Sequence, residues 1–329
     1  SIILISFYRS PYILLNGRFI GEEASHHYSY ALNNSFYENL LYFDITAGYY
    51  NFTPNFFTWF ATLFPIERAP LITVYGSLFI ILLLPYLTLF RESKLFNTSK
   101  KKFLGSLLLF ISPPFVAELW LNTLNSQIYL CLITILILFM INLSETQKKI
   151  NNLIILISSL SGIYSCALIP LFIHKYFKDK SSYNLINIVI MFVSNLIQLS
   201  LILYSKLSTK LHPSVLSNDF NINMIPNFIY NIILKSFFGR DLTQIAWNNF
   251  NFFEINYLNY SFFLLLLVFL IIVLRFKNII NFFKSNYVII YLFSIFIIIS
   301  TIIILGSLYN QIGGRYSAIP GVTLILIIF

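Results

Sequence analysis

Charged residues are scarce in this chain: Asp, Glu, Lys and Arg together make up 10% of its 329 residues. A soluble domain carries about 25% charged residues, because its surface has to be covered in water. Hydrophobic residues supply 58% of the chain, and the mean hydropathy is +0.78. Most of the surface therefore faces an apolar medium, which excludes a soluble enzyme, a disordered tail, a coiled coil and a collagen-like rod. The composition predicts a polytopic membrane protein.

Cysteine is scarce too. Cys131 and Cys166 both lie inside apolar runs, which favours membrane-buried thiols over a disulfide or a metal-binding pair. Short catalytic signatures are missing, since the sequence has no Gly-rich P-loop, GxSxG, CxxC or HExxH. ATPase, serine hydrolase, thiol redox and zinc protease activities thus lack a motif. No internal repeat of about 20–50 residues is visible, so neither a solenoid nor a duplicated transporter is expected.

Positive charge exceeds negative charge, and the formal net charge is +9. The basic residues form short clusters between apolar runs, as in membrane proteins with cytoplasmic Lys and Arg, so no nucleic-acid partner is needed. The connections at 91–102, 144–151, 174–184 and 275–285 hold thirteen Lys and Arg residues, whereas the opposite connections hold seven. This contrast places the first set of connections in the cytoplasm.

Apolar runs predict about ten membrane spans, because a hydrocarbon core of about 30 Å needs about 20 apolar residues per helix. The expected spans are 2–15, 70–90, 103–119, 127–143, 152–165, 166–177, 185–205, 259–275, 286–307 and one from 318. Both ends of the sequence interrupt apolar runs, so we expect the first and last spans to be cut short. Gly162 and Pro170 predict two short helices packed inside the protein at 152–177. Mid-span positions are expected to be almost purely apolar.

Two long loops, at about 16–69 and 206–258, then lie outside the membrane. Tyr28, Leu32, Phe36 and Leu40 recur every four residues in the first loop. This spacing predicts one helix over about 21–43 that lies along the membrane interface. The second loop contains a short apolar segment, Pro226 to Phe238, with Gly239 as its expected C-cap. The fold class is therefore an all-α transmembrane bundle, a single domain over 1–329, with interfacial helices in both external loops.

Glu22 and Glu23 begin the predicted interfacial helix. They can be first-turn acids that stabilise the helix start. They can also supply a general base for a hydroxyl group, or hold a divalent cation such as Mg²⁺ or Mn²⁺. His26 follows Glu22 at i+4, which predicts an imidazole beside the carboxylate. The adjacent histidines His26 and His27 point in different directions, so a zinc-type histidine site is not favoured.

Other polar residues cluster near the ends of spans. Arg9 lies at membrane depth, either paired with a partner or extending to the interface. Glu118, Asn122 and Asn125 follow two prolines and suit either a solvated loop or a substrate cavity. Arg315 follows two glycines and precedes Tyr316, which fits either a tight turn with an interfacial anchor or a phosphate-binding cation.

The sequence resembles the bacterial membrane glycosyltransferases of the GT-C superfamily. The strings that carry the resemblance are Arg9-Ser10-Pro11, Gly17-Arg18-Phe19-Ile20-Gly21-Glu22-Glu23, Ala47-Gly48-Tyr49-Tyr50-Asn51-Phe52, Phe64-Pro65, Glu118-Leu119-Trp120-Leu121-Asn122, Asn125-Ser126-Gln127, Ser161-Gly162, Leu168-Ile169-Pro170-Leu171-Phe172 and Gly314-Arg315-Tyr316. They extend over nearly the whole chain.

The resemblance implies transfer of a sugar from a polyprenyl-phosphate donor to a glycan, lipid or protein acceptor at the outer face of the bacterial cytoplasmic membrane. It implies that an acid of the first loop, here Glu22 or Glu23, is the base or a metal ligand. We predict that His26 tunes this acid. The predicted substrate-binding residues are Arg18, Glu118, Asn122, Asn125, Arg315 and Tyr316. In this arrangement the glutamates lie about 6–12 Å from Arg315, with one sugar between them.

Two other functions remain open. A transporter or flippase for a lipid-linked glycan would also need cations and aromatic residues near headgroups, together with polar residues at the midplane. A non-catalytic membrane scaffold would leave the Glu22 and Glu23 region facing bulk water. The sugar and the acceptor cannot be read from the sequence.

Overall fold

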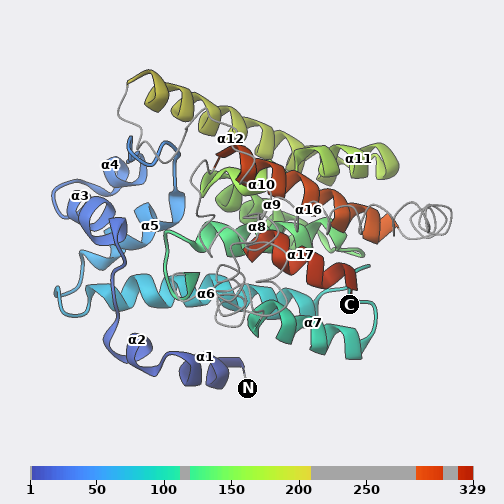
Figure 1. Cartoon of the computed structure of the whole chain (residues 1–329), viewed down its shortest axis with the longest axis horizontal. Coiled ribbons are helices and arrows are strands. Elements are labelled where there is room, and N and C mark those ends of the chain that lie inside the picture. Colours follow the sequence, from blue (N-terminus) through green and yellow to red (C-terminus); the bar gives the residue numbers. More distant parts are fainter. Residues whose placement is uncertain (1, 112–118, 209–286, 307–317, 329) are drawn as a thin grey trace, which may run out of the picture. The chain divides into compact units, whose positions relative to one another are not determined.

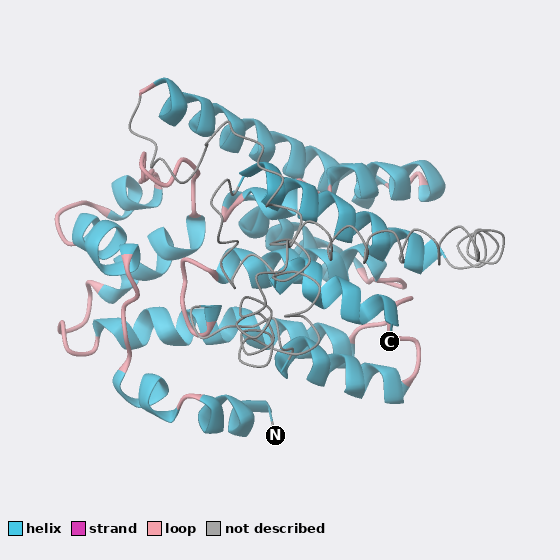
Figure 2. Ribbon diagram, in the orientation of Figure 1, coloured by secondary structure: helices cyan, strands magenta, loops and turns pink. Residues whose placement is uncertain are grey.

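The computed structural model describes residues 2–111, 119–208, 287–306 and 318–328 (Figure 1). Regular structure in these ranges is helical throughout, apart from one isolated bridge between Ser93 and Met140 (Figure 2). The all-α class is thus confirmed for the described part of the chain. The chain divides into two compact units. The first combines Ser1–Phe110 with Ala117–His212, and the second combines Ile111–Val116 with Pro213–Phe329.

The first unit begins with two short helices where one span was expected. Helix α1 (Ile2–Arg9) and helix α2 (Pro11–Asn16) are separated at Ser10. Pro11 lacks a backbone N–H and disfavours helical geometry in the residue before it, so the break follows from the sequence. Gly17 then ends α2 with φ of 72°, a conformation that only glycine adopts readily.

The loop at 16–69, predicted to be external and called the first external loop for that reason, holds four short elements: η1 (Glu23–Tyr28, a π-helix), α3 (Ser29–Ala31), α4 (Phe36–Leu40) and α5 (Phe52–Ala61). The predicted single helix over 21–43 is wrong. Ser35 starts α4 with a capping box, because its side chain accepts from the Glu38 N–H while Glu38 bonds back to the Ser35 N–H. Leu32 lies in the break and is exposed rather than part of an apolar stripe.

Two described helices are long and apolar enough to cross a membrane, α6 (Ala69–Phe90) and α12 (Ser182–Leu207). They cover the expected spans at 70–90 and 185–205. A third candidate is the pair formed by α9 (Glu145–Leu160) and the segment Ile163–Asp179, bent by 118° at the break between them. The second part of this pair contains α10 (Ile163–Cys166) and α11 (Ile169–Asp179). The break predicted at Gly162 is therefore present, but the helices around it are not packed inside the protein, because Leu153, Leu156 and Phe177 are 56%, 38% and 69% exposed.

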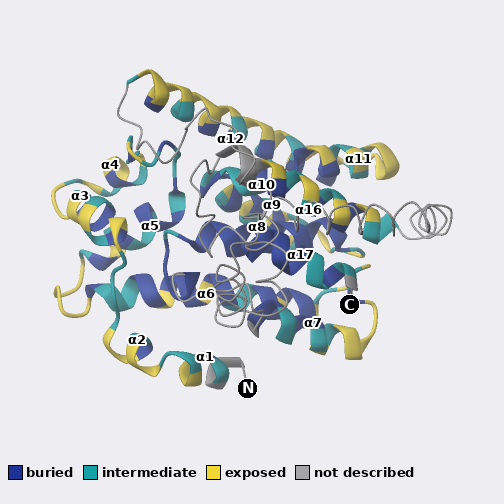
Figure 3. Ribbon diagram, viewed as in Figure 1, coloured by how far each residue is buried: buried dark blue, intermediate teal, exposed yellow. Residues whose placement is uncertain are grey.

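Shorter helices occupy other expected spans. These are α7 (Ser99–Ile111), α8 (Ser126–Phe139) and, in the second unit, α16 (Tyr287–Gly306) and α17 (Ala318–Ile328). Helix α8 is buried along its whole length and is the central helix of the first unit (Figure 3). Helices α16 and α17 pack against each other. The expected span at 259–275 and the segment from Pro226 to Gly239 lie outside the described residues.

Helix α12 has one buried side and one exposed side (Figure 3), and most of its buried side chains are polar whereas most of its exposed ones are apolar. The buried positions include Asn184, Asn187, Ser194 and Gln198, all at most 2% exposed. The exposed large apolar side chains are Leu185, Ile186, Val189, Phe192, Val193, Leu196, Ile197, Leu199, Leu203, Tyr204 and Leu207. This is the reverse of a soluble protein and fits a helix whose outer face contacts lipid. The expectation of almost purely apolar mid-span positions is wrong, because uncharged polar residues form the buried stripe.

The connections of the first unit meet at opposite ends of α8. At its C-terminal end the Lys94 N–H donates to the Phe139 carbonyl at 3.0 Å and Lys175 Nζ donates to the Leu138 carbonyl at 2.5 Å. Residues of the first external loop instead contact the segment before α8 and its first turn. Two of the Lys-rich connections therefore lie at the end of α8 opposite to the loop that carries the predicted site.

Candidate functional site

The first external loop is held against the segment that precedes α8. Arg18 Nη2 donates to the Trp120 carbonyl at 3.1 Å, and Asn51 Nδ2 donates to the Leu124 carbonyl at 3.0 Å. Gln127 Nε2 reaches the Tyr49 hydroxyl at 3.1 Å. The paired residues are 102, 73 and 78 positions apart in the sequence, respectively. The loop is therefore a fixed platform at one end of the helices.

Gln198 of α12 holds the same loop from another side. Its Oε1 accepts from the Tyr50 N–H at 3.0 Å, and its Nε2 donates to the Tyr50 carbonyl at 2.9 Å. Nε2 also lies 3.4 Å and 3.3 Å from the carbonyls of Ser159 and Leu160, at the end of α9. One buried amide thus fixes the loop, α9 and α12 together.

Glu23 is fully buried and tied to the chain on both sides. Its Oε1 accepts hydrogen bonds from the Thr123 N–H, at 3.1 Å, and from the Thr123 hydroxyl, while its Oε2 accepts from the Ile20 N–H at 3.4 Å. Burial raises the pKa of Glu23 to about 7, although these hydrogen bonds and the nearby Arg18 act to lower it. Glu22 is exposed. The two glutamates therefore differ: Glu23 is buried and links the loop to Thr123, whereas Glu22 is exposed.

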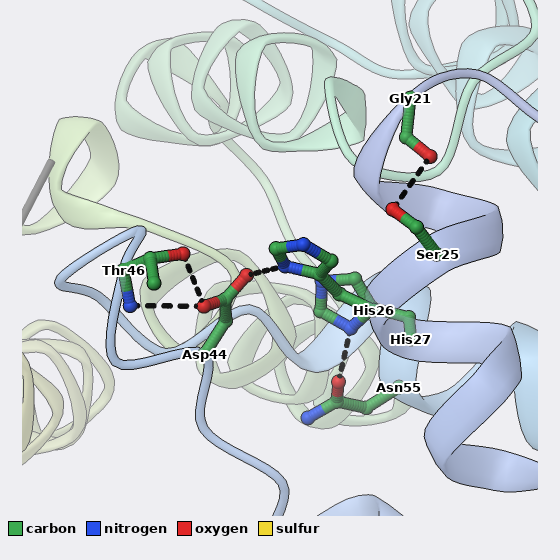
Figure 4. A network of polar contacts seen from close by, with 7 residues as sticks. All are labelled: Gly21, Ser25, His26, His27, Asp44, Thr46 and Asn55. Atoms are coloured by element: carbon green, nitrogen blue, oxygen red, sulfur yellow. Dashed lines mark hydrogen bonds and ion pairs between the residues drawn. The ribbon is translucent and has the colours of Figure 1, made fainter.

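His26 pairs with Asp44, a partner that the sequence pattern did not indicate (Figure 4). The i,i+4 spacing predicts Glu22 as its neighbour, whereas His26 Nδ1 is hydrogen bonded to Asp44 Oδ2. The other carboxylate oxygen, Oδ1, accepts from the Thr46 N–H at 2.9 Å and the Thr46 hydroxyl at 2.7 Å. Burial acts to raise the pKa of Asp44, but the hydrogen bonds from His26 and Thr46 outweigh it and lower this pKa. Asp44 therefore remains a carboxylate and can only accept.

An ionised Asp44 fixes the tautomer of a neutral His26. Nδ1 must donate to the carboxylate, so Nε2 carries the lone pair. The His26 side chain is 36% exposed, while the Asp44 side chain is 6% exposed. The arrangement presents a partly exposed imidazole acceptor backed by a buried anion, which is the geometry of a general base.

His27, the next residue of η1, has a structural role. Its Nδ1 lies 2.7 Å from Asn55 Oδ1, and Asn55 Nδ2 donates to the Tyr42 carbonyl at 2.7 Å (Figure 4). Burial lowers the pKa of His27 to about 4, so the ring is neutral at physiological pH. His27 and Asn55 thereby join η1 to α5 and hold the segment that carries Asp44.

Two arginines meet at Trp120. The Arg9 guanidinium carbon lies 4.3 Å from the centroid of the Trp120 ring, and Arg18 bonds to the Trp120 backbone carbonyl. Arg9 thus has an aromatic partner, as expected for a cation at membrane depth. Guanidinium groups suit phosphate because they donate two parallel hydrogen bonds. Arg18 also lies near the Glu23 carboxyl and interacts with it electrostatically.

The remaining predicted residues fall into two groups. Asn122 and Asn125 are buried beside the start of α8. Asn122 Oδ1 accepts from the Leu124 N–H at 2.8 Å, and its carbonyl accepts from Ser77 on α6 at 3.2 Å, so Asn122 shapes the segment that binds the external loop. Glu118, Arg315 and Tyr316 lie outside the described residues, and so does the predicted distance between the glutamates and Arg315.

Metal ligands do not gather in the described part of the chain. Its His, Cys, Asp and Glu residues form no group of three or more that could hold a metal ion. His26 and Asp44 pair with each other and with Thr46, and these residues alone do not make a divalent-cation site. The chemistry of the site is therefore argued from its protein groups.

The sequence matches no protein-family model, and no curated protein or solved structure matches it. Function therefore has to be inferred from the residues of the site.

Proposed function

We propose that this chain is a GT-C-type membrane glycosyltransferase. It moves a sugar from a polyprenyl-phosphate donor to a glycan, lipid or protein acceptor at the outer face of the bacterial cytoplasmic membrane. In this proposal one domain of about ten spans carries the site in its external loops.

The pairing of His26 with Asp44 is the observation that carries the proposal. The pair belongs to the loop that leads into the candidate span α6. A donor whose phosphate sits among lipid headgroups requires a base near that level, and an imidazole oriented by a carboxylate is a base suited to near-neutral pH. Arg9, at the end of α1, and Arg18, at the start of the loop, both contact Trp120 and supply positive charge for the phosphate.

The reaction follows from these positions. His26 Nε2 takes the proton from an acceptor hydroxyl as the acceptor oxygen bonds to the anomeric carbon of the donor sugar. The bond between that carbon and the phosphate oxygen breaks, and its electron pair leaves with the lipid phosphate. Asp44 stabilises the imidazolium that forms. Cations near the phosphate stabilise the charge that grows on the leaving group.

Other residues have supporting roles in this proposal. Glu23 positions the segment before α8 rather than acting as the base. Exposed Glu22 is the remaining acid of the motif for a divalent cation, if the reaction uses Mg²⁺ or Mn²⁺. The substrate-binding roles of Arg315, Tyr316, Glu118, Asn122 and Asn125 stay as predicted from the sequence.

A direct assay tests the proposal. The purified full-length chain is incubated in lipid nanodiscs with a panel of radiolabelled polyprenyl-phosphate sugars and a membrane extract as acceptor. We expect label to move from the donor to a new product, and His26→Gln to abolish most of this transfer. Ser25→Ala is the matched control, because Ser25 is an exposed neighbour on the same π-helix (Figure 4). Equal transfer by the wild-type chain and His26→Gln would reject His26 as the base.

The buried polar stripe of α12 favours a second function. Asn184, Asn187, Ser194 and Gln198 extend along one side of this candidate span, and polar side chains within spans are typical of transport paths. A transporter or flippase for a lipid-linked glycan would move its substrate without breaking the phosphate bond. Proteoliposomes with a labelled donor distinguish the two functions, because a flippase exposes intact donor on the far side whereas a transferase releases lipid phosphate. If neither intact donor on the far side nor released lipid phosphate is seen, the chain is a non-catalytic membrane protein.

A further inference from the structure

Helix α5 of the external loop has a polar face directed inward and an aromatic face directed outward. Its buried residues are Thr53, Pro54, Asn55, Thr58 and Ala61. The other side, here called the α5 aromatic face, consists of Phe52, Phe56, Trp59 and Phe60, which are all at least partly exposed, whereas Phe57 packs against α6. A loop helix in water would bury its aromatic residues and expose its threonines. The distribution is the same as on α12.

Hydrogen bonds explain why the polar face can point inward. Thr53 Oγ1 lies 2.7 Å from Ser161 Oγ at the end of α9, and Thr58 Oγ1 donates to the Pro54 carbonyl at 2.6 Å. Asn55 bonds to His27 and to the Tyr42 carbonyl. Thr53, Asn55 and Thr58 thus each have a hydrogen-bond partner within the protein. Because these polar groups need no water, α5 can place its aromatic side chains in an apolar medium.

Contact with α6 gives the depth of α5. A Cβ atom added at Gly76 would lie 2.4 Å from the ring of Phe57, so the two helices touch at this glycine. Gly76 is seven residues from the start of α6 at Ala69, which is about 10 Å along the helix axis at 1.5 Å per residue. At about 33 Å, the 22 residues of α6 match a hydrocarbon core of about 30 Å. Helix α5 therefore lies beside the outer third of the span and not above it.

Apolar side chains continue the α5 aromatic face on both sides. Phe36 of α4 contacts Trp59, with ring centroids 4.7 Å apart. Between α5 and α6, Leu63, Phe64 and Ile66 are 61%, 45% and 58% exposed. No charged residue occurs within α5. The apolar surface therefore extends to Ile66, and the exposed Glu67 and Arg68 follow it before α6 begins at Ala69.

We propose that α5 is a re-entrant helix whose aromatic face contacts the lipid of the outer leaflet. Ten residues reach about 15 Å, too short to cross the bilayer, so the chain enters and leaves on the same side. Phenylalanine contacts the upper acyl chains, and Trp59 reaches the headgroup boundary, where tryptophan is enriched. This inference is independent of the proposed enzymatic activity.

Tryptophan fluorescence tests the lipid contact, because the chain has only three tryptophans, Trp59, Trp120 and Trp247. The double variant Trp120→Phe/Trp247→Phe retains Trp59 alone. It is reconstituted into vesicles of phosphatidylcholine, with or without bromine on the upper part of the acyl chains. We expect about twofold lower emission with the brominated lipid, since bromine at that depth reaches only side chains within the bilayer. Aqueous iodide should have little effect.

The matched control is Trp59→Phe/Trp247→Phe, which retains Trp120. Trp120 is 2% exposed, so neither quencher should reach it, and its emission also reports that the protein is folded. Iodide quenching of Trp59 would overturn the proposal by placing α5 in water. Blue emission from Trp59 without quenching by either agent would also overturn it, because another protein surface would then cover the α5 aromatic face.

Discussion

Burial of Glu23 makes the stability of the folded chain depend on pH. The pKa of its carboxyl is raised from 4.5 to about 7 in the folded chain. A raised pKa means that the folded state holds the proton more tightly than the unfolded state does. The stabilisation is therefore fully present below about pH 4.5, and it is lost as the pH rises through 7.

We predict that Glu23→Gln removes this pH dependence, since a neutral amide cannot titrate. For the wild-type chain, the shift corresponds to a loss on the order of 3 kcal/mol between pH 4.5 and 8. Thermal unfolding of the purified protein across this range measures the effect. Glu22→Gln is the control, because Glu22 is exposed. An unchanged pH profile in Glu23→Gln would show that another group is responsible.

His26 and Asp44 should fail in different ways when each is replaced. His26→Gln removes the basic ring nitrogen, and loss of a well-placed base lowers kcat by about 10²–10⁴-fold with little change in KM. Asp44→Asn keeps the shape of the side chain but offers an N–H group to Nδ1, which favours the wrong tautomer. Steady-state transfer assays measure both variants. A rise in KM alone would indicate that the pair binds substrate and does not move a proton.

Sequence reasoning identified His26 but not its partner. The i,i+4 rule assumes an α-helix, whereas residues 23–28 form a π-helix, and the partner Asp44 lies 18 residues away. One signal was available, because an Asp followed two residues later by Thr favours a local turn that orients its carboxylate. The distinction between Glu22 and Glu23 was not predictable, since burial of Glu23 depends on Thr123, 100 residues further along.

Packing between helices depends on glycine at the sharp turn between α9 and α10. Gly162 has φ of 150°, and a Cβ atom there would lie 2.0 Å from Gln127 Oε1. Gln127 in turn contacts Tyr49 of the external loop. Both the bend of 118° and the contact between Gln127 and the external loop therefore require glycine at position 162.

We predict that Gly162→Ala destabilises the protein by at least about 2 kcal/mol, because backbone strain and the collision with Gln127 add together. Gly21→Ala is the matched comparison. Gly21 has φ of 51° but nothing within 4 Å of an added Cβ, so only the left-handed strain of about 1–2 kcal/mol applies. Thermal unfolding in detergent compares the two variants. Equal losses would mean that Gln127 moves aside.

Hydropathy located the helices better than it located their faces. The spans at 70–90 and 185–205 could be predicted because length and apolar content alone specify them. Helix α5 was missed, since its ten residues mix Thr, Pro and Asn with aromatic residues and show neither a long apolar run nor an ordinary amphipathic pattern. The break at residues 32–35 was also missed, because the four-residue recurrence concealed the capping box at Ser35.

The basic clusters predict the orientation of the chain in the membrane, and this prediction can be measured directly. We predict that Tyr37, 76% exposed in the first external loop, is outside, whereas Lys101 and Glu145 are in the cytoplasm. Each is replaced by Cys in a Cys131→Ala/Cys166→Ala background and treated with a membrane-impermeant maleimide.

In intact cells we expect labelling at position 37 only, and at positions 101 and 145 after the membrane is opened. Labelling of position 101 in intact cells would reverse the orientation, and with it the location proposed for the site. The control is the cysteine-free chain, which should take no label. The original thiols are both buried, so their removal from the core should perturb the surface little.

Gln198 couples the position of α12 to that of the external loop. It lies 16 residues from the start of the helix at Ser182, a distance of about 24 Å. A tilt of about 5° about that starting point would move the Gln198 amide by about 2 Å, whereas N–H···O distances tolerate only about 0.5 Å. Because the amide grips both the N–H and the carbonyl of Tyr50, the loop must follow the helix. Changes in bilayer thickness that tilt α12 would therefore displace the backbone six residues from Asp44.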